Sequence, residues 1–132
     1  MFIKKKEITK LKSVPVDPYS MPEPIAIQDY FQRGMAFYAR KLYDAAEKDL
    51  RRVVELDPKS VDGFYGLGMV YKAAKRNAEA IQSFEEAIRV LREGAVENHN
   101  KSEMLRRLAL GHVNELKTGD WDMEKEIWHH IQ

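Results

Sequence analysis

Residues 64–92, FYGLGMVYKAAKRNAEAIQSFEEAIRVLR, decide the fold, because residues 30–58, YFQRGMAFYARKLYDAAEKDLRRVVELDP, carry the same pattern 34 positions earlier. Each copy spaces its small, aromatic and aliphatic residues as two amphipathic helices do, with a short break between them. A repeat unit of this kind buries its apolar face only against its neighbours. The sequence therefore predicts an all-α array of helix pairs that offers a surface for binding.

Length and composition fit one soluble domain with a tail. The chain has 132 residues, of which 44% are hydrophobic and 33% charged, and its net charge is +1. We expect no general binding of nucleic acid from that charge, and no stable membrane association, because no apolar run approaches the ~18 residues of a membrane span. The start MFIKKKEITK lacks the apolar core of a signal peptide. With no cysteine in the chain, these features favour a cytoplasmic protein.

The two copies agree at the positions that pack a helix pair together. Tyr30 and Phe64, Gly34 and Gly68, Phe37 and Tyr71, Ala46 and Ala80, Leu50 and Phe84, and Val54 and Ile88 are equivalent pairs. Glycine inside a helix costs about 1 kcal/mol relative to alanine, so its presence in both copies indicates a packing reason. We expect Gly34 and Gly68 to let the two helices of a unit approach closely.

These residues resemble the tetratricopeptide repeat family. The second copy matches its pattern at Phe64, Leu67, Gly68, Tyr71, Ala80 and Phe84, and the first at Tyr30, Gly34, Phe37, Ala46, Leu50 and Pro58. Arg33 departs from the usual Leu, and Arg92 from the usual Pro. The resemblance implies a right-handed superhelix of antiparallel helix pairs, an α-solenoid whose inner face is formed by the first helix of each unit.

The chain divides into a head and a repeat domain. Residues 1–25 hold a lysine-rich start and four prolines, and read as an extended or disordered segment; residues 26–132 form the helical domain. Two other interpretations of residues 1–25 are a weak amphipathic helix and a strap. As a strap it would fold back and lay apolar residues on the array, among them Val14, Val16, Tyr19 and Ile25.

We assign repeats to residues 27–60 and 61–94, and a degenerate third unit to 102–132. Its first helix would carry Leu108 and Gly111, with Ser102 as a possible cap and Gly119 as the stop. Its second helix would carry Glu124, Trp128 and Ile131. A loop or a lengthened helix is expected around residues 94–100. In this interpretation Trp121 and Trp128 close the core.

The sequence contains almost none of the motifs that enzymes and metal sites use. The sequence has no cysteine nucleophile, no glycine-rich phosphate loop and no HExxH motif. His129 and His130 are adjacent, which on a helix points them apart. His99 and His112 stand alone. We expect no enzyme activity, no cofactor and no metal site.

The informative residues lie on the first helix of each unit and take no part in packing within the unit. We expect the groove to contain Phe31, Met35, Tyr38, Tyr65, Met69, Lys72, Arg106 and Val113. Aromatic and thioether side chains on such a face suit an apolar peptide or helix, although they would also suit packing on the next unit. Relatives that bind acidic chaperone peptides use a clamp of Lys, Asn and Arg at inner-face sites where this chain has Phe31, Met35, Tyr65 and Met69.

Two functions follow. The first is a non-catalytic adaptor, scaffold or assembly factor that binds an apolar peptide or helix of a protein partner in its concave groove. The second is a structural module that forms a homo-oligomer through the groove or the C-terminal helix.

Overall fold

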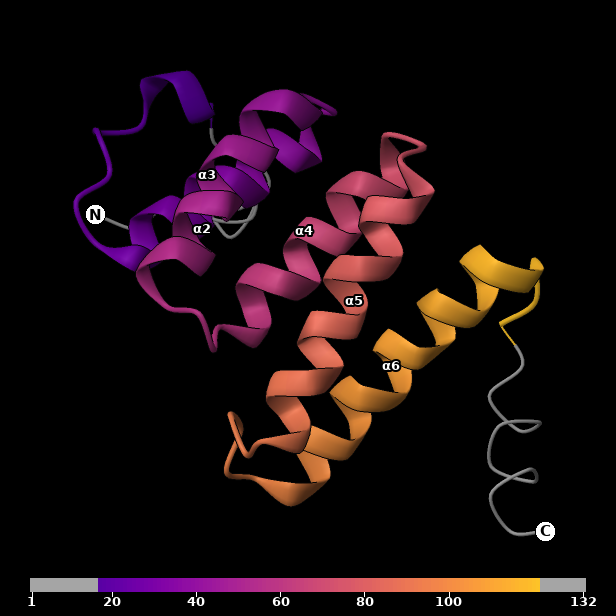
Figure 1. Ribbon diagram of the computed structural model, residues 1–132. Coiled ribbons are helices and arrows are strands. Elements are labelled where there is room, and N and C mark those ends of the chain that lie inside the picture. The colour runs from indigo at the N-terminus through magenta and orange to yellow at the C-terminus, as the bar shows by residue number, and fades with distance from the viewer. Residues whose placement is uncertain (1–16, 122–132) are drawn as a thin grey trace, which may run out of the picture.

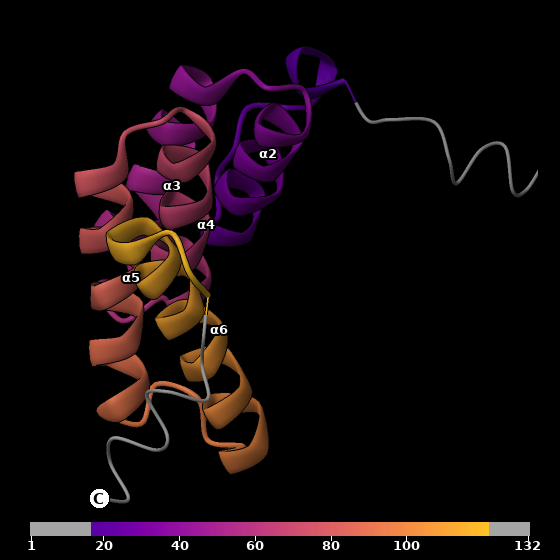
Figure 2. The same cartoon turned by 90° about the vertical axis from the view of Figure 1, so that its right-hand side faces the viewer.

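The computed structural model describes residues 17–121, and over that range the chain is all-α, as predicted. Its elements are a short 3-10 helix, η1 (Pro18–Ser20), and the helices α2 (Ile27–Ala39), α3 (Tyr43–Leu56), α4 (Val61–Ala73), α5 (Asn77–Arg92) and α6 (His99–Thr118). Consecutive helices pack on one another along the chain (Figure 1). Helices α3 and α5 lie on one side of this array, with α2 and α6 on the other (Figure 2). The array of helix pairs is that of an α-solenoid.

In the first turn of three helices, a side chain accepts a hydrogen bond from a backbone amide. The Asp29 carboxylate accepts from the Ala26 amide at 3.1 Å, and Ser60 Oγ accepts from Gly63 at 3.0 Å. Asn98 Oδ1 accepts from Lys101 at 2.9 Å. Because Asn98 satisfies one of the first free donors of α6, this helix starts at His99, ahead of the predicted cap Ser102.

The turns inside the two repeats share an unusual backbone. Lys41 has φ 63° and Lys75 has φ 64°, in the left-handed region that side chains other than glycine rarely adopt. In each turn the amide of the next residue donates back to the helix, from Leu42 to the Phe37 carbonyl at 2.9 Å and from Arg76 to that of Tyr71 at 2.8 Å. The hydrogen bonds of this helix end hold a strained residue in place in both repeats.

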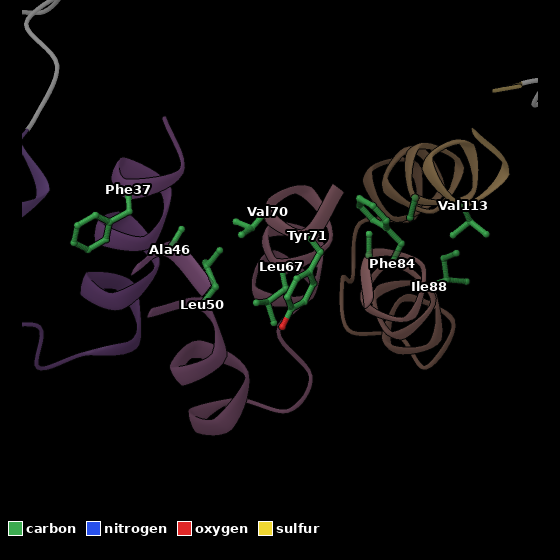
Figure 3. Packing of buried hydrophobic residues seen from close by; sticks show 11 residues of the cluster. Phe37, Ala46, Leu50, Leu67, Val70, Tyr71, Phe84, Ile88 and Val113 are labelled. Atoms are coloured by element: carbon green, nitrogen blue, oxygen red, sulfur yellow. The ribbon is translucent and has the colours of Figure 1, made fainter. Parts of the chain in front are cut away.

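The core runs through both repeats and into α6 (Figure 3). Leu50 and Phe84 are fully buried and occupy equivalent positions on α3 and α5. A Cβ at Gly68 would lie 2.6 Å from the Phe84 ring, which explains the glycine. Burial of side chains of this size stabilises the fold by about 1.5–3 kcal/mol each.

Arg33, which replaces the usual leucine, makes a buried ion pair. Its Nε and Nη2 each donate to Asp49 on α3 at 2.7 Å. The Asp49 side chain is 3% exposed and that of Arg33 is 18% exposed. The second repeat has Leu67 and Ser83 at the same two positions, so the first repeat exchanges an apolar contact for a charged one.

A polar network joins the two repeats across α3, α4 and the start of α5. Glu47 on α3 accepts from Arg76 at 2.6 Å and from the Tyr71 hydroxyl at 3.0 Å. Arg51 donates to the same hydroxyl at 3.2 Å. Burial raises the pKa of Glu47, but the hydrogen bonds from Arg76 and Tyr71 and the charges of Arg76 and Arg51 together hold it below its usual value. Each repeat therefore supplies polar groups that form hydrogen bonds and ion pairs with those of the other.

The segment before α2 lies against that helix. Pro18 is buried, and the Tyr19 ring meets Phe37 edge-on at 5.2 Å while staying 72% exposed. Glu23 approaches Arg33 at 3.5 Å, whereas Ile25 points to solvent. Tyr19 thus packs on α2 as the strap interpretation expects, whereas Ile25 does not. Val14 and Val16 lie outside the described residues.

The third unit departs from the regular repeat at its turn. In the first two repeats the inner glycines face Leu50 and Phe84, sixteen residues later in both units. Gly111 instead faces Trp121, which lies two residues beyond Gly119, the residue that caps the end of α6. The second helix predicted for this unit, with Glu124, Trp128 and Ile131, and the pair His129 and His130, lie outside the described residues.

Candidate functional site

Six of the eight expected groove residues lie together on two neighbouring helices. They are Phe31, Met35 and Tyr38 on α2, and Tyr65, Met69 and Lys72 on α4, and all are half-buried. The Met35 sulfur would lie 3.6 Å from a Cβ on Gly66, so the α2 side chains reach across to α4. The five apolar and aromatic members also pack against the core. These side chains therefore both join the units and keep part of their surface free.

The two expected groove residues on α6 lie elsewhere. Val113 is 6% exposed and sits in the core beside Ile88 of α5 (Figure 3). Arg106 is half-buried and pairs with Glu103 at 2.8 Å on its own helix. The α6 side chains that reach α4 are His112 and Glu115, because Gly111 follows Gly68 by 43 residues and His112 therefore takes the place of Met69.

A polar cluster joins α4 to α6 at this point. Lys72 Nζ lies 3.0 Å from Glu115 and 3.0 Å from His112 Nδ1. His112 Nε2 lies 3.0 Å from the Tyr65 hydroxyl. Two of the expected groove residues, Tyr65 and Lys72, are thus held in place by α6.

The imidazole of His112 is enclosed by aromatic rings. It stacks on Phe84 with centroids 4.6 Å apart and planes 6° from parallel, and Trp121 meets it edge-on at 4.7 Å. Burial, and then the charge of Lys72, lower the pKa of His112 to about 4, while Glu115 opposes them. His112 is therefore neutral at physiological pH.

Trp121 extends this cluster toward an exposed apolar patch on α6. The Lys72 ammonium lies 5.7 Å from the centre of the indole ring, a cation–π contact. Met104 and Leu108 are 53% and 39% exposed, and with Trp121 they line a shallow pocket of about 520 Å³. A second groove, of about 740 Å³, lies between α5 and α6 and includes Ile88, Leu110 and Val113.

The sequence reasoning missed His112 and did not place Trp121 beside the groove. A signal was present for His112, since aligning Gly111 with Gly34 and Gly68 puts it in register with Met35 and Met69. The sequence carries no comparable signal for the contact between Trp121 and Lys72, because it depends on the shape of the turn after α6.

Comparisons with known proteins agree with this architecture. The sequence model described as tetratricopeptide repeat matches residues 30–60 and 61–90. The chain is also 39% identical over 57 residues to cellulose synthase 2 operon protein C of Komagataeibacter xylinus. That match covers 43% of this chain and 4% of the relative. No solved structure matches the chain.

The central part of the chain, residues 30–90, therefore belongs to the tetratricopeptide repeat family. Repeats of this family generally mediate contacts between proteins and generally lack catalytic activity. Within the described range, no helix is long and apolar enough to cross a bilayer. Residues 17–121 also bring together no group of three or more His, Cys, Asp or Glu side chains that could hold a metal ion.

Proposed function

We propose that this protein is a non-catalytic interaction module that binds an apolar peptide or helix of another protein in the groove formed by α2, α4 and α6. The observation that carries the proposal is the half-buried stripe of Phe31, Met35, Tyr65 and Met69 on neighbouring inner helices. Large rings supply contact area, and flexible thioethers adapt to the side chain that docks. An amphipathic helix or extended segment places its apolar side chains on such a surface.

The test is recovery of partners by wild-type protein and by a variant of the stripe, Tyr65→Ala with Met69→Glu. The glutamate puts a charge on the surface that the partner would desolvate, so recovery should fall strongly. A matched variant carries the same charge away from the groove, at the exposed Leu56 of α3, and should recover partners as wild type does. Equal recovery by all three proteins would show that these partners do not bind in the groove.

A second candidate function is self-association through α6, favoured by the exposed Met104 and Leu108 beside Trp121. Two such patches facing each other would remove apolar surface from water on both copies. Light scattering over a range of protein concentrations separates the two functions. A dimer that Met104→Glu with Leu108→Glu converts to monomer supports self-association, and a strict monomer supports the adaptor.

A further inference from the structure

The contacts of His112 fix the direction of a chain of hydrogen bonds. A lysine ammonium can only donate, so Lys72 Nζ donates to His112 Nδ1 across 3.0 Å. A neutral imidazole carries one proton, which must then sit on Nε2. His112 Nε2 therefore donates to the Tyr65 oxygen, also across 3.0 Å.

This direction leaves the proton of the Tyr65 hydroxyl free. The oxygen accepts from His112 Nε2, and this is the one hydrogen bond that the Tyr65 hydroxyl makes among residues 17–121. Burial raises the pKa of Tyr65, so the phenol keeps its proton at physiological pH. Donors in series polarise one another, and the charge of Lys72 at the head of the chain strengthens the last donor.

The net charge of the polar cluster around Tyr65 determines which kind of acceptor its hydroxyl can bind. Lys72 is balanced by Glu115 at 3.0 Å and His112 is neutral, so the cluster has no net charge. A carboxylate would gain little attraction here and would meet the partly exposed Glu115. A neutral carbonyl oxygen meets no such repulsion.

We propose that the Tyr65 hydroxyl is the hydrogen-bond donor of the groove and that it binds a main-chain carbonyl of an extended partner segment. The proposal rests on the proposed function. A partner that covers Tyr65 excludes solvent from the hydroxyl and must offer an acceptor for its proton. Carbonyls inside a helix are already occupied, whereas an extended segment has free carbonyls along its length. The Tyr65 hydroxyl thus binds the partner's backbone, and the apolar stripe contacts the partner's side chains.

The test uses peptides selected from a random library displayed on phage against wild-type protein, then synthesised. Affinity is measured for wild type, Tyr65→Phe and the matched control Tyr71→Phe. The control also removes a hydroxyl bonded to charged groups, Arg51 and Glu47, but away from the groove. We expect Tyr65→Phe to weaken every peptide by about 2- to 10-fold, as for loss of one hydrogen bond, and Tyr71→Phe to change none.

An ester scan of one peptide locates the acceptor, since an ester carbonyl accepts more weakly than an amide. One ester position should weaken binding to wild type but not to Tyr65→Phe. Urea unfolding of each variant checks that the fold persists. Nitrogen-15 NMR of the partner-free protein tests the direction of the chain, with the His112 proton expected on Nε2.

Each outcome bears on the proposal. A proton on Nδ1, or equal affinity of Tyr65→Phe and wild type, overturns the role of Tyr65 and leaves the groove intact. A loss confined to peptides with an acidic side chain overturns the main-chain acceptor in favour of a carboxylate. Failure to select any peptide refutes the groove as a peptide site, and this proposal with it.

Discussion

Exchanging Arg33 for Leu and Asp49 for Ser would give the first repeat the pair that the second repeat has at Leu67 and Ser83. Arg33→Leu alone leaves the Asp49 carboxylate buried without its cation and without two hydrogen bonds of 2.7 Å. Loss of one partner of a buried pair costs about 3–5 kcal/mol in the free energy of unfolding. We expect this single change to be the most damaging of the set.

The other variants follow from the same contacts. Asp49→Ser alone should cost less, about 1–3 kcal/mol, because Arg33 is nearer the surface and keeps Glu23 at 3.5 Å. The double variant should lie within about 1 kcal/mol of wild type, since an apolar side chain replaces a desolvated charge. The three values together imply a coupling of about 3 kcal/mol or more between the two residues.

Urea unfolding followed by circular dichroism gives the three free energies. The exposed pair Arg52 and Glu55 on α3 is the matched control, because its 3.2 Å contact lies in solvent and its removal should have no measurable effect. If the double variant loses the sum of the two single losses, Arg33 and Asp49 do not act as a unit. The ion pair would then contribute no coupling energy to the first repeat.

Three further predictions concern the frame of the array. Because the folded pKa of His112, about 4, lies below its ordinary 6.5, the unfolded chain binds this proton first. Stability should therefore fall by roughly 2–3 kcal/mol as pH drops from about 6.5 to about 4, and a His112→Gln variant with the same pH profile in urea would contradict this. Lys75→Gly should raise the free energy of unfolding by about 0.5–1 kcal/mol, since it relieves φ 64°; a lower urea midpoint would count against strain at that turn. Gly68→Ala should lower the melting temperature, at a cost of about 1–3 kcal/mol, because its Cβ would meet the fully buried Phe84 ring; an unchanged melting temperature would show that the ring can move.

The repeat frame was predictable because it depends on local spacing. The equivalence of Gly34 with Gly68 and of Leu50 with Phe84 requires only that two helices of similar length pack face to face, and both structural pairs are present. Because the offset between the repeats is 34 residues, the inner-face residues predicted on α2 also identified their equivalents on α4. Whether those residues bind a partner stays a prediction.

Prediction failed where the offset changed. The loop at residues 93–98 shifts α6 out of the 34-residue register, so His112 and Glu115 face α4 in place of the expected Arg106 and Val113. The pairing of Arg33 with Asp49 was also missed. Its two residues are far apart in sequence, and only the geometry of α2 against α3 shows that their side chains meet.

The network of Glu47, Arg51, Tyr71 and Arg76 bears on how the array comes apart. Repeat proteins often lose their end units first, because an end unit packs on a neighbour at one side only. Here, unfolding of either repeat would strand partly buried charges in the other, since Glu47 belongs to the first and Arg76 to the second. Amide hydrogen exchange should therefore report one common opening of α3, α4 and α5, so that the two repeats behave as a single cooperative unit.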